Sequence, residues 1–328
     1  MLEEVVLETI NKNNLIKNGD SIVVGVSGGP DSITLLDILI KLQKNIKFNI
    51  VVAHINHMIR TDADEDQEYV EKYCKKNNIP FYVKREKVEI LAKNQKIGTE
   101  EAGRNLRYEF FNEVLQKTKS NKIATAHTKN DNVETVLMNI IRGSGTKGLT
   151  GIEIIRDDKY IRPLLEISRT EIEEYCEKNN LAPRIDSTNM ENIYTRNKIR
   201  NLLIPYIQKE FNPNIIEAVD RLSKISKEEN KYFEKITQKI YEDILVEETK
   251  NEIVLDLKKF NTLEIVIKNR IMLYTINRLF GSSSGIEKIH LQDIIKLCNN
   301  NIGNKYLVPN KKVKILLKNK QIFIMKNL

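Results

Sequence analysis

Apolar residues in the first half of the chain form short β-branched runs that alternate with longer amphipathic stretches. The short runs predict strands at residues 21–26, 49–55, 81–84 and 122–126. The longer stretches have the apolar spacing of helices, at residues 30–44, 64–77, 99–117 and 130–141. Strands that alternate with helices are typical of βαβ units, so this half predicts an α/β fold with a doubly wound parallel sheet.

The second half of the chain lacks this alternation. A capping-box sequence at residues 168–171 opens a further helix, and Pro205 and the Asn212-Pro213 dipeptide interrupt the chain after it. Residues 214–243 then form a long, charged helical stretch. We therefore place a boundary near residue 210, between an α/β domain at 1–210 and a smaller, mostly helical domain at 211–328. The smaller domain should end in short strands, at residues 306–308, 313–317 and 321–325.

The composition is that of an ordinary globular protein, with 41% hydrophobic and 30% charged residues. No apolar stretch is long enough to cross a membrane, and the acidic amino terminus does not resemble a signal peptide. We therefore expect a cytoplasmic protein that does not associate with a membrane. The three cysteines form no C-x-x-C pair, which argues against a zinc site or a disulfide framework.

The net charge of +8 is unevenly distributed along the chain. Residues 301–328 contain seven lysines, among them Lys311, Lys312 and Lys314, and no aspartate or glutamate. A localised basic patch is typical of a protein that binds a polyanion such as RNA. On charge alone, a solvated lysine-rich face explains the same pattern equally well.

One glycine-rich segment lies between the first predicted strand and the helix that follows it. It reads Ser27, Gly28, Gly29, Pro30, Asp31 and Ser32. The two glycines let the backbone approach an anion closely, and the N–H groups at the start of the helix point towards it. The serines add hydroxyl donors, and Asp31 is placed to hold Mg²⁺ against a phosphate. A tight turn without a ligand would need small residues but not an acid at this point, so the segment predicts a phosphate site.

The segment resembles the S-G-G-x-D-S signature of PP-loop ATP pyrophosphatases. Further segments are similar to motifs of tRNA(Ile)-lysidine synthases, namely residues 54–60 (H-x-N-H-x-L-R), 104–108 (R-x-x-R-Y), 126–135 (A-H-x-x-D-D-x-x-E-T), 162–165 (R-P-L-L), 186–189 (D-S-x-N) and 194–200 (Y-x-R-N-x-x-R). Ile59 replaces the usual leucine, and Asn130 replaces the first aspartate, which puts any role of that position in doubt. The resemblance covers essentially all of residues 20–210 and implies an adenine nucleotide alpha hydrolase-like fold.

The resemblance also implies a reaction, its cofactors and its partners. ATP, with Mg²⁺, adenylates the C2 carbonyl oxygen of the wobble cytidine in the CAU anticodon of tRNA(Ile). The ε-amine of free L-lysine then attacks C2 and displaces AMP, which forms lysidine. In this scheme residues 27–32 and His54 bind ATP, Asp31 binds the metal and is catalytic, and His127 lies beside the reacting base. Metal ligation by His54 and His57 is disfavoured because no cysteine completes a ligand set.

Binding of a diamino acid requires anions for its amines and a cation for its carboxylate. Asp131 and Glu134 lie three residues apart, on one face of a helix that begins near the end of the fourth strand. We assign both to free lysine, together with Arg107 for the carboxylate; a solvated helix face is the alternative. For Arg107 the alternatives are binding of phosphate and an ordinary surface charge. For His127 the alternative is an ordinary loop histidine. The sequence does not identify the residue that acts as the general base.

Cations near the predicted domain boundary and at the carboxyl terminus are candidates for contact with tRNA. Arg196 and Arg200 suit tRNA phosphates or an active-site carboxylate, and a plain surface patch is the alternative. We assign them to tRNA, together with Lys311, Lys312 and Lys314.

Two other functions fit parts of the sequence. A PP-loop tRNA thiolase shares the loop and the RNA partner, but such enzymes usually need persulfide or cluster cysteines, and those here are scattered. A tRNA-binding module with a vestigial nucleotide loop would not be expected to keep Asp31 and both serines. The sequence leaves open the oligomeric state, a homodimer included, and how the methionine-accepting tRNA is rejected. Many lysidine synthases have a further carboxyl-terminal domain, so this chain is either a short form or a truncated one.

Overall fold

The chain folds into two compact units. The computed structural model describes residues 2–58, 63–184, 192, 194–283, 285–300 and 305–327. Contacts divide the chain into Met1–Lys227 and Glu228–Leu328. The division lies inside the long helix α10 (Ile215–Ile244), whereas the sequence places a boundary near residue 210. Because α10 continues from one unit into the next, no proline or glycine marks the division, and the sequence gives no signal for it.

The first unit contains a six-stranded sheet in the order β3-β2-β1-β4-β6-β5. Its strands are β1 (Ser21–Gly25), β2 (Asn49–Asn56), β3 (Phe81–Arg85), β4 (Lys122–Ala124), β5 (Ile155–Arg156) and β6 (Tyr160–Ile161). Neighbouring strands pair in parallel except β5, which is antiparallel to β6. The predicted parallel α/β sheet is confirmed. The β5–β6 hairpin was not predicted, because its strands are too short to give a period of two.

Helices connect and cover these strands. They are α1 (Leu2–Lys12), α2 (Pro30–Leu42), α3 (Ala63–Lys76), α4 (Val88–Gln95), α5 (Thr99–Lys117), α6 (Lys129–Ile141), η1 (Thr146–Thr150), α7 (Arg169–Lys178), α8 (Thr195–Lys198), the π-helical turn η3 (Ile199–Leu203) and α9 (Ile204–Glu210). The predicted helices are present with closely similar bounds, and α1, α4, η1, α8, η3 and α9 are additional. No helix in the described ranges is both long and apolar enough to span a membrane.

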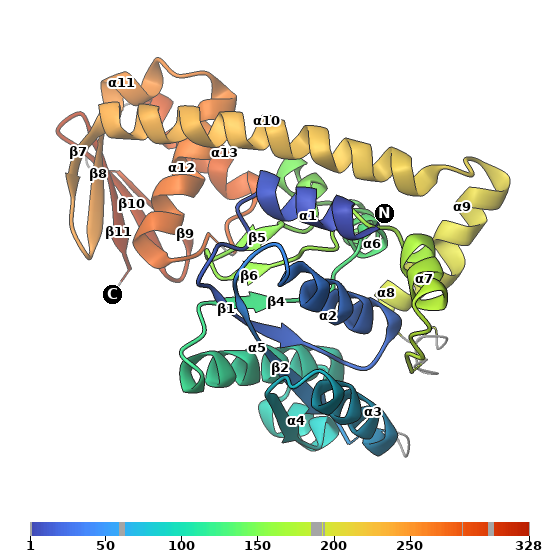
Figure 1. Ribbon diagram of the computed structural model, residues 1–328. Coiled ribbons are helices and arrows are strands. Elements are labelled where there is room, and N and C mark those ends of the chain that lie inside the picture. Colours follow the sequence, from blue (N-terminus) through green and yellow to red (C-terminus); the bar gives the residue numbers. More distant parts are fainter. Residues whose placement is uncertain are drawn as a thin grey trace. The chain divides into compact units, whose positions relative to one another are not determined.

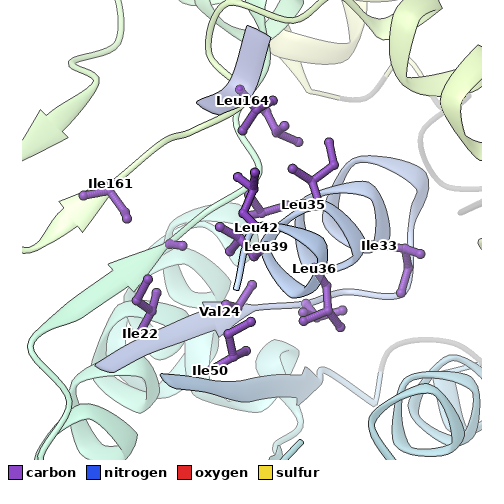
Figure 2. Packing of buried hydrophobic residues seen from close by; sticks show 14 of the residues in the cluster. Ile22, Val24, Ile33, Leu35, Leu36, Leu39, Leu42, Ile50, Ile161 and Leu164 are labelled. Atoms are coloured by element: carbon purple, nitrogen blue, oxygen red, sulfur yellow. The ribbon is translucent and has the colours of Figure 1, made fainter. Parts of the chain in front are cut away.

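The sheet is covered on both faces. Successive strand residues point to opposite faces, so Ile22 and Val24 pack in the cluster that contains α2, whereas Val23 packs with Phe111 of α5. Figure 2 shows the α2 side of this core, and Figure 1 shows α2 and α5 on either side of β1. A Cβ atom on Gly25 would overlap Cζ of Phe111, so glycine is needed for α5 to pack against the end of β1.

The second unit is built on an antiparallel sheet in the order β7-β8-β11-β10-β9. Its further elements are β7 (Leu245–Glu248), β8 (Glu252–Asp256), α11 (Leu257–Asn261), α12 (Ile265–Phe280), α13 (Lys288–Asn300), β9 (Tyr306–Asn310), β10 (Val313–Lys318) and β11 (Gln321–Lys326). The predicted carboxyl-terminal strands are confirmed. The β7–β8 hairpin adds two strands to a unit that the sequence described as mostly helical.

Candidate active site

A cavity lies at the carboxyl ends of β1 and β4. Because β2 and β4 flank β1 on opposite sides, the connections that follow β1 and β4 diverge there, which is where α/β sheets bind ligands. The cavity has a volume of about 800 Å³. Of the residues that the sequence assigns to a site, it is lined by Ser27, Gly29, Pro30, Asp31, Ser32, His54, Arg107, His127, Asp131, Arg196 and Arg200. Gly28 and Glu134 are not part of its lining.

Internal hydrogen bonds shape the loop between β1 and α2. The N–H of Ser27 donates to Oγ of Ser32 at 3.1 Å, and this hydroxyl donates to the carbonyl of Gly29 at 3.0 Å. Gly28 has a φ of +96°, in the left-handed region that glycine occupies without strain. Gly29 caps α2 without a side-chain hydrogen bond, so the helix presents its first N–H groups as an anion site.

Asp31 provides a carboxylate beside this anion site. Burial raises its pKa to about 6, with the negative charge of Asp131 in support and the positive charges of Arg169 and Arg200 in opposition. Within the described residues, its buried Oδ1 atom has no hydrogen-bond partner. A buried carboxylate oxygen without a donor suits a cation such as Mg²⁺. Within the described residues, no group of three or more His, Cys, Asp or Glu is placed to hold a metal ion.

His54 presents a neutral imidazole to the cavity. Its Nδ1–H donates to the carbonyl of Val26 at 2.8 Å, which leaves Nε2 as a hydrogen-bond acceptor. Burial lowers the pKa of this ring, and Nε2 is buried without a partner in the part of the chain that the structure describes. The geometry therefore offers one unused acceptor to a ligand that carries an N–H or O–H group.

Asp131 is held at the first turn of α6 by a capping box. Its Oδ2 accepts from the N–H of Thr128 at 2.9 Å, and its Oδ1 accepts from Nη2 of both Arg196 and Arg200 at 3.0 Å. Burial alone would raise the pKa of Asp131, but the nearby charges, above all that of Arg196, hold it below its ordinary value. Asp131 is therefore ionised at neutral pH.

Glu134 lies one turn further along α6 and is buried, with 1% of its side chain exposed. Nε of Arg196 donates to Oε2 at 2.8 Å, and Nε of Arg200 donates to Oε1 at 2.5 Å. In the structure, Glu134 binds two arginines and does not line the cavity, and both arginines also bind Asp131. The assignments of Glu134 to lysine and of Arg196 and Arg200 to tRNA stay predictions.

His127 follows β4, and its Nδ1 lies 3.0 Å from Oγ1 of Thr125. Burial lowers the pKa of His127 to about 3, against the attraction of Asp131 and with the added repulsion of Arg162, Arg196 and Arg107. The imidazole is therefore neutral at physiological pH. In the ligand-free protein it suits the role of a proton acceptor better than that of an acid.

Arg107 extends from α5 into the cavity. Surrounding protein lowers the pKa of the Arg107 guanidinium by burial, although the residue remains exposed to solvent. This combination is expected for a side chain that projects into a cavity. Among the described residues it forms no ion pair. A guanidinium without a carboxylate partner attracts a ligand carboxylate or phosphate.

Asn130 stands where the lysidine-synthase motif has an aspartate, and the structure explains why asparagine fits there. Its Oδ1 accepts from the backbone N–H of Arg169 at 2.9 Å and so joins the first turns of α6 and α7. Aspartate and asparagine both offer this oxygen, so the substitution preserves the contact.

Among the cavity residues that the sequence did not predict are two arginines, Arg169 and Arg184, which tertiary folding brings to the site. The backbone N–H of Arg184 donates to the carbonyl of Gly28 at 3.0 Å. Of the motifs noted in the sequence, Ile59, Arg60 and residues 186–189 lie outside the described residues. Lys311 and Lys312 are exposed between β9 and β10 in the second unit, and Nζ of Lys314 lies 4.9 Å from the ring centroid of Tyr306.

The fold and the loop define a nucleotide-binding α/β protein, and comparisons with known proteins agree. The family described as the PP-loop domain matches residues 2–207. A tRNA(Ile)-lysidine synthase of Clostridioides difficile (strain 630) is 45% identical over 98% of this chain and 71% of its own length. A tRNA(Ile)-lysidine synthase of Clostridium acetobutylicum is 47% identical over 93% of this chain and 66% of its own length.

Solved structures support the fold. A U34-tRNA thiolase from Methanococcus maripaludis aligns with a TM-score of 0.57 and 21% identity, over 69% of this chain and 78% of the thiolase. At that identity the likeness shows the fold alone. The chain belongs to the PP-loop proteins and, within them, to the tRNA(Ile)-lysidine synthase family.

Proposed function

We propose that the protein ligates free L-lysine to C2 of the wobble cytidine of tRNA(Ile) with a CAU anticodon. The C2 carbonyl oxygen attacks the α-phosphorus of ATP, and the bond to pyrophosphate breaks. The lysine ε-nitrogen then bonds to C2, the C2–O bond breaks with AMP as the leaving group, and the nitrogen loses its proton. One observation carries the proposal: Asp31 and Asp131 line a single cavity in a member of this family. Asp31 lies beside an anion site, and Asp131 is ionised.

The first half of the reaction requires the loop to hold the phosphates of ATP. The uncapped start of α2 would bind the released pyrophosphate, and Asp31 would hold Mg²⁺ against it. The ion would neutralise charge that develops on the phosphates. His54, with its free acceptor, would bind an N–H or O–H group of the nucleotide.

The second half requires a site for lysine next to the adenylated base. We assign an amino group of lysine to Asp131, which is ionised, and its carboxylate to Arg107, which has no carboxylate partner among the described residues. His127, as a neutral imidazole, is a candidate acceptor for the proton that the ε-nitrogen loses. The low pKa makes it a weak base until bound phosphates add negative charge nearby.

The thiolase alternative is not favoured by the cysteines. Cys74, Cys176 and Cys298 are all free and buried. Burial raises the pKa of Cys74 and of Cys298 to about 12, and it also raises the pKa of Cys176. The thiolate is the form that attacks or binds a metal, so these thiols suit packing better than sulfur transfer.

The order of product release tests the proposal. Release of pyrophosphate should require ATP, Mg²⁺ and a tRNA with a CAU anticodon, and release of AMP should require lysine as well. Radiolabelled ATP with thin-layer chromatography distinguishes the two products. Release of AMP and pyrophosphate at the same rate without tRNA would contradict a tRNA-dependent adenylation.

We also propose that the lysines near β10 bind tRNA phosphates. Replacing Lys311, Lys312 and Lys314 together by glutamate should weaken tRNA binding and reduce the slope of log affinity against log salt by about 0.7–0.9 for each phosphate that is no longer neutralised. Cognate and non-cognate tRNAs should be affected alike, because phosphate contacts carry no sequence information. Fluorescence anisotropy across a salt series measures both quantities, with circular dichroism as the folding control. An unchanged affinity and slope would mean that these lysines form only a solvated edge.

A further inference from the structure

A stack of arginines and tyrosines lies beside the cavity in the first unit. Cζ of Arg104 lies 5.4 Å from the ring centroid of Tyr108. Cζ of Arg156 lies 4.8 Å from the same centroid and 4.4 Å from that of Tyr160. The two rings meet edge to face at 5.3 Å. We call these four residues the arginine–tyrosine stack.

The sequence builds this stack from two elements. Arg104, Tyr108 and Asn112 are spaced by four residues and so share one face of α5. In the β5–β6 hairpin, Arg156 pairs directly with Tyr160 across the strands. Nδ2 of Asn112 donates to the Tyr160 hydroxyl at 2.8 Å and joins the hairpin to the helix.

The turn of the hairpin contributes to this arrangement. Asp157 and Asp158 both have a φ of +52°, a conformation that aspartate tolerates better than most residues and that a tight hairpin turn requires. The turn keeps the hairpin short, so that Arg156 faces α5. Packing against the tyrosine rings holds both guanidinium groups, and Arg156 has in addition one ion pair with Asp157.

The charges of the stack are poorly neutralised. Nε of Arg156 makes no hydrogen bond within the described residues, and its ion pair with Asp157 is 3.4 Å long. Because 66% of the Asp157 side chain is exposed, that pair contributes little and a stronger anion can displace it. Arg104 forms no ion pair in the described part of the chain.

The stack also adjoins the cavity. Tyr108 is both a member of the stack and a residue of the cavity wall, next to Arg107. Arg104 and Arg156 do not line the cavity themselves. An anion bound by these two side chains would therefore lie outside the space for ATP and lysine.

We propose that the arginine–tyrosine stack binds backbone phosphates of the RNA strand that carries the reacting cytidine. This inference rests on the proposed function. A base that enters a cavity brings the phosphates on either side of it to the rim. A guanidinium that is already fixed by aromatic stacking loses little freedom when it binds phosphate through two N–H groups, so the affinity per contact is high.

The test uses the full chain and an RNA hairpin with the sequence of the anticodon arm. Arg156→Gln should weaken hairpin binding about tenfold at low salt and reduce the salt slope by about 1. Arg156→Lys should recover only part of the affinity, because it restores the charge without the planar fork. The matched control is Lys117→Gln on the same helix as Arg104, where Nζ lies 5.0 Å from the ring centroid of Tyr82 and outside the cavity wall. The control should bind as the wild type does.

The outcomes separate this inference from the proposed function. Normal hairpin binding and salt slope in folded Arg156→Gln and Arg104→Gln variants would overturn the inference, even if the wild type forms lysidine. An equal loss of affinity in Lys117→Gln would also overturn it, because it would show a diffuse charge effect. A selective loss in Arg156→Gln supports the stack as an RNA surface even if no lysidine is formed. If Arg156→Gln does not fold, as judged by thermal melting, Arg104→Gln decides the question alone.

Discussion

Replacing Asp31 by asparagine is expected to abolish ATP-dependent release of pyrophosphate and to stabilise the ligand-free protein near neutral pH. The loss of activity should be at least about a hundredfold, because the charge that would hold Mg²⁺ against the phosphates is removed. The gain in stability follows from the burial of this carboxylate, whose Oδ1 has no partner among the described residues. A side chain kept at a cost to stability is typical of a functional site.

The raised pKa of Asp31 determines how the stability difference between the two proteins depends on pH. Burial raises the pKa of Asp31 from 3.8 to about 6, so the native state binds the proton more tightly than the unfolded state. The free energy of unfolding therefore falls as pH rises from about 4 to about 6, by at most about 3 kcal/mol, and the loss is complete above that range. Asparagine lacks this ionisation, so the variant should exceed the wild type in stability above pH 6 and approach it towards pH 4.

Thermal denaturation from pH 4 to pH 8 measures the difference between the two proteins. Mg²⁺ with ATP should raise the melting temperature of the wild type but not that of Asp31→Asn. The control is Asp293→Asn, which removes an exposed charge from α13 in the second unit. Normal pyrophosphate release by Asp31→Asn would refute the assignment of the loop.

Replacing Glu134 by alanine is expected to destabilise the protein by about 3–5 kcal/mol. Its carboxylate is buried and binds Nε of both Arg196 and Arg200, so the substitution leaves two partly buried cations with Asp131 alone. Asp131→Asn is the matched variant, because it changes the same network from the side of the cavity. It should cost less stability and should raise KM for lysine more than KM for ATP.

Urea unfolding measures the stability of both variants, and the lysine dependence of AMP release measures the second effect. A Glu134→Ala protein with the stability of the wild type would show that the arginines are not held by this carboxylate. An unchanged KM for lysine in Asp131→Asn would remove Asp131 from the lysine site.

Local features of this protein could be predicted from its sequence, and long-range contacts could not. Helix α5 was predicted with its observed bounds, and the phosphate loop was predicted because all of its residues are contiguous. The pairing of Glu134 with Arg196 joins residues 62 positions apart, and nothing in the periodicity of either segment indicates it. The sequence therefore assigned the acid pair on α6 to a substrate without indicating that Asp131 and Glu134 both bind Arg196 and Arg200.

The same distinction explains where the structure differs from the expected elements and boundary. The strands of the β5–β6 hairpin contain two residues each, too few for an alternating pattern. Helix α10 continues through the division between the units, so the sequence signals near residue 210 mark the end of α9 and not the division itself.

The most direct measurement is mass spectrometry of nucleosides from tRNA incubated with the protein. The reaction contains ATP, Mg²⁺, free lysine and transcribed tRNA(Ile) with a CAU anticodon, and parallel reactions omit one component each. We expect the wobble cytidine to gain the mass of lysine minus water in the complete reaction only, and Asp31→Asn to form none of this product. An unmodified wobble cytidine in the complete reaction, or a cytidine that carries sulfur when a sulfur donor is added, would contradict the proposed function.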